Sequence, residues 1–146
     1  MIQESTGFYQ KRLSIPQESL GRIELLIGLF EKLDSSFTPE RYFISDYLVG
    51  EEREWKHLYL FSNQKIWIAY KFLTVYEFEQ VPIPAKEAFP IQLSVKSFDF
   101  VTYNDKSRFA STVQVGKFQL ELKATQANCM ALLDILKTYF IQPIPL

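Results

Sequence analysis

Residues 57–72 read HLYLFSNQKIWIAYKF and hold the clearest strand pattern of the chain. Aromatic and β-branched side chains fill 57–61 and 66–72, and such side chains favour strands. The polar residues 62–65 between them predict a hairpin turn. Alternation along the second strand predicts a core face and an opposite face. We expect Ile66, Ile68, Tyr70 and Phe72 on the core face, and Trp67, Ala69 and Lys71 on the other.

Further strands are expected on both sides of this hairpin. The predicted strands cover 42–49, 57–61, 66–72, 75–81, 95–103, 109–115 and 118–124. The charged run 51–54 reads as an exposed loop, and 116–117 as a hairpin corner. Strands followed by a closing helix at 126–140, with Thr125 as its N-cap, predict an α+β class.

A helix is predicted at 15–34, with Ser14 as its cap and Pro16 in the first turn. Its apolar positions cover roughly 220° of the helix circumference at ~100° per residue. A helix that lies on one sheet needs less. The helix is therefore either buried on two sides or offers the extra stripe of Leu25, Leu29 and Leu33 to a partner. The polar residues 1–14 before it are expected to form a flexible arm.

Length and composition predict one domain over residues 1–146. Hydrophobic residues make up 47% of the chain and aromatic residues 16%, so a large core is expected. The formal net charge is −1, which gives no field to steer nucleic acid. The lone Cys129 excludes an internal disulfide and suits a reducing, cytoplasmic location. We expect no signal peptide and no transmembrane segment, because no apolar run approaches ~20 residues.

Three segments resemble bacterial pleckstrin-homology-like domains. These are 60–68 (LFSNQKIWI), 91–98 (IQLSVKSF), and the strand 116–123 with the helix 126–140. The resemblance covers residues ~42–142. It implies an antiparallel β-barrel or sandwich with a C-terminal capping helix, to which this chain adds the helix 15–34. It further implies a binding or scaffold module and no enzyme, with no particular ligand.

Catalytic and metal chemistry find little support in the sequence. His57 and Cys129 are the only histidine and cysteine, and Cys129 falls inside the apolar arc of the last helix, where a thiol is inert. Zinc needs three or four ligands of these types. Glu77 and Glu79 alternate onto one strand face and read as a solvated pair. We therefore expect no catalytic residues, no metal and no cofactor.

Two binding readings rest on basic and aromatic residues. The stretch Trp67 to Phe72 interleaves aromatic side chains with Lys71, as base-stacking sheets do, but ordinary packing is preferred. A basic rim suggests a lipid head group only weakly, and solvation is preferred. That rim would consist of Lys65, Lys71, Lys96, Lys117 and Lys123.

The sequence thus favours a noncatalytic protein-interaction or scaffold module. Its partner would be another protein or a second copy of the chain, with Leu25, Leu29 and Leu33 as the contact. A carrier of a small apolar ligand or lipid is the alternative, since small barrels can enclose one. An enzyme with an unrecognised site is the third reading.

Overall fold

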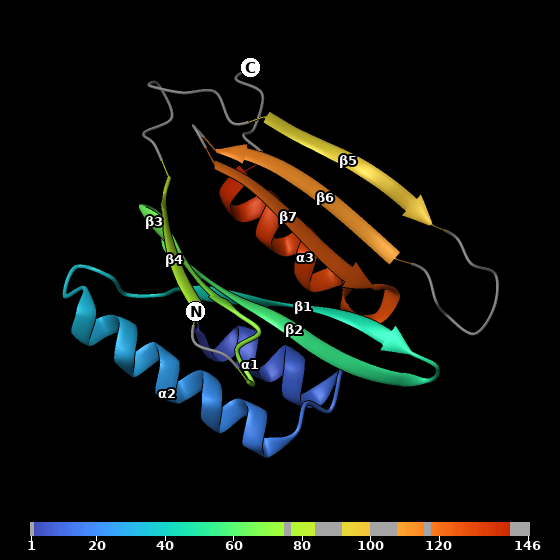
Figure 1. Ribbon diagram of the computed structural model, residues 1–146, viewed down its shortest axis with the longest axis horizontal. Coiled ribbons are helices and arrows are strands. Elements are labelled where there is room, and N and C mark those ends of the chain that lie inside the picture. Colours follow the sequence, from blue (N-terminus) through green and yellow to red (C-terminus); the bar gives the residue numbers. More distant parts are fainter. Residues whose placement is uncertain (1, 75–76, 84–91, 100–107, 116–117, 141–146) are drawn as a thin grey trace. The chain divides into compact units, whose positions relative to one another are not determined.

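The computed structural model describes residues 2–74, 77–83, 92–99, 108–115 and 118–140. They form helices and antiparallel strands, which confirms the α+β class (Figure 1). The chain divides into two compact units. Unit 1 comprises Met1–Ser45 and Trp55–Pro82, and unit 2 comprises Asp46–Glu54 and Ile83–Leu146. The expectation of a single domain over residues 1–146 stays a prediction.

Unit 1 combines two helices with most of a four-stranded sheet. The elements are α1 (Ile2–Lys11), α2 (Gln17–Leu33), β1 (Arg41–Val49), β2 (Glu52–Phe61), β3 (Lys65–Tyr70) and β4 (Glu77–Pro82). The strands lie in the order β1-β2-β3-β4. Phe61 pairs with Ile66, and the N–H of Ser62 donates to the carbonyl of Lys65 at 3.0 Å. The hairpin predicted at 62–65 is therefore confirmed.

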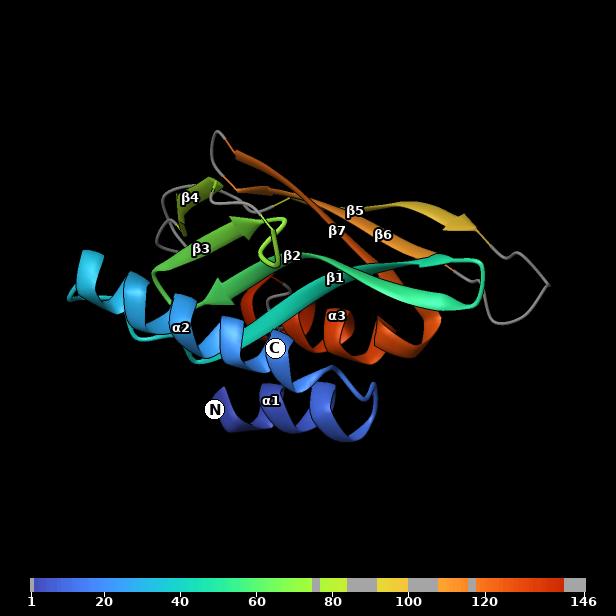
Figure 2. The ribbon, with the colours of Figure 1, turned by 60° about the horizontal axis from the view of Figure 1, so that its bottom comes forward.

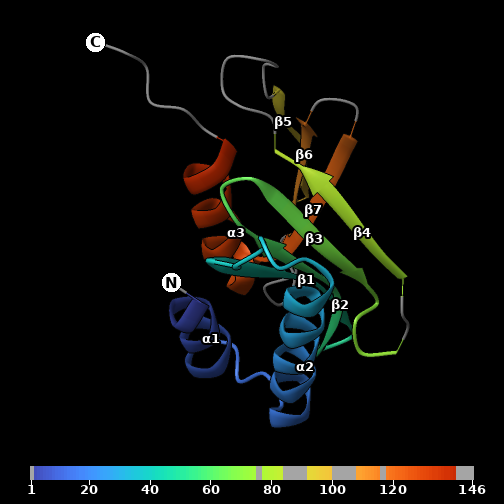
Figure 3. The ribbon, with the colours of Figure 1, turned by 90° about the vertical axis from the view of Figure 1, so that its left-hand side faces the viewer.

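The central strands of this sheet are buried on both faces. Ile66 and Ile68 of β3 are 0% and 1% exposed, and Ala69, which points to the opposite face, is 0% exposed. On that opposite face Phe30 of α2 stacks on Trp67, with ring centroids 4.8 Å apart. Figures 2 and 3 show α1 and α2 side by side along the sheet. Residue Trp67 therefore packs against a helix, as the preference for ordinary packing expects.

Residues 2–11 form a helix, so the expectation of a flexible arm at 1–14 is wrong. The hydroxyl of Tyr9 accepts a hydrogen bond from the N–H of Ile44 at 2.9 Å, and Ser5 Oγ accepts one from the N–H of Tyr42 at 3.0 Å. β1 is the edge strand of the sheet among the described strands, so its outer side has no neighbouring strand there. α1 supplies acceptors for these N–H groups and covers the edge.

The helix predicted at 15–34 is confirmed as α2, but its cap is not Ser14. Pro16 occupies the N-cap position, and Ser14 adopts a left-handed backbone with φ 50° in the link from α1. Leu13 and Ile15 on either side of it are buried. Two anchored apolar neighbours thus fix a tight connection at Ser14, where the sequence pattern alone suggested a cap.

Unit 2 holds a three-stranded sheet and the C-terminal helix. The strands β5 (Gln92–Asp99), β6 (Arg108–Val115) and β7 (Phe118–Thr125) lie in that order (Figure 1). A helical stretch follows as η1 (Gln126–Asn128), α3 (Cys129–Ile135) and η2 (Leu136–Phe140), which confirms the helix at 126–140. Leu132, Ile135 and Leu136 are buried, whereas Leu133 is 53% exposed.

One further expectation is corrected. The run 51–54 is not a loop, since β2 begins at Glu52 and alternates exposed with half-buried residues. Arg53 points inward there and forms an ion pair with Asp46 at 3.0 Å. The described strands form two sheets with neighbours in sequence order and no closed barrel, so the pleckstrin-homology-like barrel or sandwich stays a prediction. Residues 75–76, 100–103 and 116–117 of the predicted strands and corner lie outside the described residues.

Candidate functional site

α2 has one face that packs and one face that does not. Leu20, Ile23 and Leu26 are at most 6% exposed, and Phe30 is 0% exposed. Phe30 contacts Trp67 and meets the ring of Phe78 edge-on at 5.0 Å. This face fixes α2 on the sheet, and one sheet contact is what an amphipathic helix of this length normally makes.

The predicted stripe lies away from this packed face. Leu25 and Leu33 are 62% and 63% exposed, and Leu29 between them is half-buried. The three residues are four apart, so they lie on neighbouring turns of the same face. The sequence left two alternatives for α2, burial on two sides or an exposed stripe. The described residues show the exposed stripe. The stripe therefore faces outward, and Leu29 lies deeper than the two leucines on either side of it.

Two charged residues and two glycines surround Leu25 on α2. Glu18 and Lys32 are exposed, and neither forms an ion pair within the described part of the chain. Gly21 and Gly28 lie inside the helix, where glycine destabilises by roughly 0.5–1 kcal/mol relative to alanine. A Cβ atom added at either glycine would meet nothing within 4 Å. Packing inside the described chain therefore does not require these glycines.

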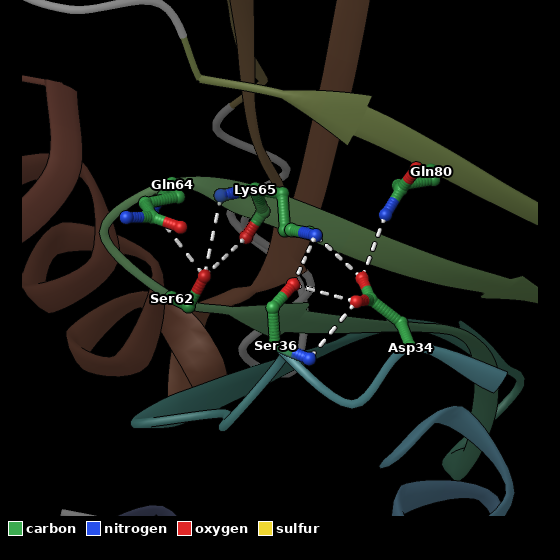
Figure 4. A network of polar contacts seen from close by, with 6 residues as sticks. All are labelled: Asp34, Ser36, Ser62, Gln64, Lys65 and Gln80. Carbon is green, nitrogen blue, oxygen red and sulfur yellow. Dashed lines mark hydrogen bonds and ion pairs between the residues drawn. The ribbon is translucent and has the colours of Figure 1, made fainter. Parts of the chain in front are cut away.

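The C-terminal end of α2 is held by a polar network around Asp34 (Figure 4). The Nζ atom of Lys65 donates to Oδ2 of Asp34 at 2.5 Å, and Gln80 Nε2 donates to the same oxygen at 3.0 Å. The N–H and hydroxyl of Ser36 both donate to Oδ1. The hydrogen bond from Lys65 is the main cause that lowers the pKa of Asp34 to about 2. The network joins the helix end to β3 and β4.

The β2–β3 turn places Lys65 for this contact. The N–H groups of Gln64 and Lys65 donate to Oγ of Ser62 at 3.3 and 3.2 Å (Figure 4). The side chain of Ser62 thus holds the turn that begins β3. Together with the bond from Arg22 Nε to the carbonyl of Phe72 at 3.0 Å, these contacts make α2 a firmly seated helix.

His57 serves a structural purpose in unit 1. Its Nδ1 atom accepts a hydrogen bond from the N–H of Lys71 at 3.0 Å. Desolvation lowers its pKa to about 4, and the charges of Lys56 and Lys71 act in the same direction. The imidazole is therefore neutral at pH 7, with its proton on Nε2. The Nδ1 atom thus takes the place of a backbone carbonyl as the acceptor for the N–H of Lys71, at the start of the turn between β3 and β4.

The other candidate groups are divided between the units, with Glu77 and Glu79 in unit 1 and Cys129 in unit 2. Cys129 is half-buried, less buried than expected, and desolvation raises the pKa of its thiol, which disfavours the thiolate nucleophile. Glu77 is exposed, but Glu79 is half-buried and accepts a hydrogen bond from the hydroxyl of Tyr70. Burial and that bond raise the pKa of Tyr70. Among the described residues, no group of three potential ligands lies together to hold a metal.

The predicted basic rim draws its described lysines from both units, Lys65 and Lys71 from unit 1 and Lys123 from unit 2. Lys65 is taken up by Asp34, and Lys123 forms an exposed ion pair with Glu121 at 3.4 Å. The Lys96 side chain and Lys117 lie outside the described residues. A lipid head group as ligand therefore stays a prediction. In the described ranges no helix is long and apolar enough to cross a membrane, and the cytoplasmic location stays a prediction.

A buried carboxylate in unit 2 was missed by the sequence analysis. The Asp46 side chain is 0% exposed. It accepts hydrogen bonds from the N–H of Thr125 at 2.8 Å, from the hydroxyl of Thr125 at 2.7 Å and from Nδ2 of Asn128 at 3.0 Å. Arg53 supplies the opposite charge. The sequence did carry a signal for this site: Asp46 is the only charged residue in the apolar stretch YFISDYLV. A carboxylate in such a stretch is buried only where partners compensate its charge.

Comparison with known proteins adds no family. No protein-family model, no curated protein and no solved structure matches this chain. The pleckstrin-homology-like resemblance therefore stays a prediction. The outward stripe of α2 is one of the apolar surfaces that packing within the described chain leaves exposed, and it holds Leu25 and Leu33 on one helix.

Proposed function

We propose that this protein is a noncatalytic protein-interaction module that contacts its partner through the stripe of α2. The outward position of Leu25 and Leu33, 62% and 63% exposed, is the observation that carries the proposal. Exposed apolar patches on folded domains often mark interfaces. The packed face of the helix is anchored on the sheet, so the stripe beside it is presented on a rigid element, as a docking surface requires.

The proposal includes the pleckstrin-homology-like plan as the scaffold. The meander order of β1 to β4 and of β5 to β7, followed by a C-terminal helix, supports it. α2 would then be the addition that gives this chain its own binding surface. An experimental structure tests the plan: two antiparallel sheets that pack face to face and are capped by the C-terminal helix support it, and sheets that do not pack on each other contradict it.

The interface is tested by the double variant Leu25→Glu/Leu33→Glu. Burying the exposed part of each leucine contributes about 1–2 kcal/mol to association. The double variant should therefore weaken binding by roughly 100-fold. Native mass spectrometry on protein purified gently from its host measures the loss: the unchanged chain should carry a partner or a multiple of its own mass, and the variant should not.

Gln10→Glu is the matched control, since it adds a carboxylate at an exposed position of α1, outside the helix that carries the stripe. It should keep the partner. Thermal unfolding should show equal stability for all three proteins. A double variant that unfolds would place the leucines in the core, and a double variant that retains its partner would place the interface elsewhere. Either result contradicts the proposal.

A further inference from the structure

We propose that the partner seated on the α2 stripe is a second copy of this chain, with the two α2 helices antiparallel about a two-fold axis at Leu25. This inference rests on the proposed function and names its partner. Two observations on α2 support it: the placement of opposite charges around Leu25, and the placement of a glycine and a leucine around the same point.

The charges are spaced for antiparallel pairing. Glu18 and Lys32 each lie seven residues from Leu25, one on each side. Seven residues are two helical turns, so all three positions share a face. In an antiparallel pair centred on Leu25, Glu18 of one copy faces Lys32 of the other, about 10 Å from the axis. The pairing occurs twice, because a two-fold interface repeats every contact.

The sizes of the side chains on α2 fit the same two-fold symmetry about Leu25. Gly21 and Leu29 each lie four residues from Leu25, on opposite sides. The antiparallel pair therefore places Leu29 of one copy over Gly21 of the other. The space above Gly21 is open, with nothing within 4 Å of an added Cβ. A leucine from the second copy would fill it, which explains a glycine that contacts within the described chain do not require.

This symmetry favours a second copy over an unrelated protein. An unrelated partner would need only a complementary surface, and nothing would relate Glu18 to Lys32. Here α2 carries both members of each contact, the anion with its cation and the leucine with its glycine. A surface complementary to itself under a half-turn is what an isologous dimer requires.

Charge exchange tests the pairing. Glu18→Lys and Lys32→Glu should each weaken self-association about tenfold, because both exposed pairs of the dimer change from attraction to repulsion. An equimolar mixture of the two single variants should form a heterodimer of higher affinity than either homodimer. In that heterodimer one contact pairs two introduced charges of opposite sign, and the other keeps the two original ones. The chain that carries both changes should recover the original affinity. Analytical ultracentrifugation over a concentration series measures each constant.

A cross-link tests the axis. In a Cys129→Ser background, Leu25→Cys should give a disulfide-linked dimer under mild oxidation, because the axis brings the two copies of position 25 together. Glu31→Cys in the same background is the control, exposed on α2 but outside the stripe, and should stay uncross-linked. Retained secondary structure, followed by circular dichroism, separates these effects from misfolding.

The outcomes separate the two proposals. A dimer with heterodimer rescue and a cross-link at position 25 supports the antiparallel pairing. A chain that stays monomeric at every concentration overturns the second copy, whereas the docking surface is still judged by the host partner that Leu25→Glu/Leu33→Glu loses. A dimer that survives this double variant overturns both, because it associates through another surface. Association without rescue in the mixture overturns the antiparallel pairing.

Discussion

The Nδ1 atom of His57 accepts its hydrogen bond from Lys71, whose backbone is left-handed with φ 50°. Few residues other than glycine adopt this conformation, so the surroundings have to hold it. Phe72 contributes to this, since it is 0% exposed and its N–H donates to the carbonyl of Lys56 at 3.3 Å. The turn after β3 thus depends on an unprotonated His57.

Acid should weaken the fold through His57. Its folded pKa of about 4 lies below the ordinary value of 6.5, so between these values the unfolded chain binds a proton that the folded chain does not. Its contribution is complete above pH 6.5 and is lost as the pH falls toward 4. We expect a loss of about 1–2 kcal/mol, less than the full shift implies because the ring is half-buried and screened. Urea unfolding across this range measures it.

His57→Gln provides the comparison, because it cannot titrate. Its stability should change less than that of the unchanged chain between pH 6.5 and 4. Asp34 does not affect the comparison over this range. Because its pKa is lowered from 3.8 to about 2, its effect on the pH dependence of stability falls below pH 3.8. Equal pH profiles for both proteins over the His57 range would show that the imidazole does not control the turn.

Single residues were predictable where their role is local. The turn at 62–65 follows from four consecutive polar residues. Helical periodicity identified the stripe of Leu25 and Leu33 but left open whether it is buried or exposed. Asp46 was not predictable in this way, because its partners Thr125 and Asn128 are 79 and 82 residues away. A pattern read in short windows contains no information about such a contact.

At the scale of elements, α1 depends on a contact that its own sequence does not reveal. Residues 1–14 lack a continuous apolar stripe, so periodicity predicts no helix there. Tyr9 provides what is missing: it is 0% exposed, stacks on Tyr42 with centroids 5.7 Å apart and meets Trp55 edge-on. Tertiary packing stabilises most helices of this length. Most strand residues and α2 carry their own patterns and were therefore predictable, whereas the charged start of β2 at 52–54 was not.

Tyr9→Phe should destabilise the edge of the sheet. The ring contacts remain, but the N–H of Ile44 loses the hydroxyl that accepts its hydrogen bond. A buried donor that loses its acceptor costs about 1–3 kcal/mol. Chemical denaturation should show this loss, and amide exchange at Ile44 should accelerate. Tyr47→Phe is the control, since this tyrosine is 40% exposed on the same strand. Equal stability of both variants would mean that α1 does not protect the edge.

At the scale of the whole molecule, β1 and β2 each belong to both units. Unit 2 takes Asp46–Glu54 from these strands, and unit 1 takes the rest. Strand order was predictable because neighbours in sequence pair. Whether the strands close into one barrel was not predictable, because closure depends on pairings between strands that are distant in the sequence. The shared strands lead us to expect that neither unit unfolds without the other, in keeping with the single domain expected from length.

Asp46→Asn tests this expectation, because its partners Arg53, Thr125 and Asn128 belong to unit 2 whereas both tryptophans belong to unit 1. Removing the charge breaks the buried ion pair with Arg53 and should cost about 3 kcal/mol. If the chain unfolds as one domain, tryptophan fluorescence in unit 1 reports this loss, with the same midpoint as circular dichroism. Glu52→Gln, exposed on the same ribbon, should leave both midpoints unchanged. A fluorescence midpoint that stays fixed while circular dichroism shows an earlier loss would mean that the shared strands do not couple the units, and the chain would then consist of two domains.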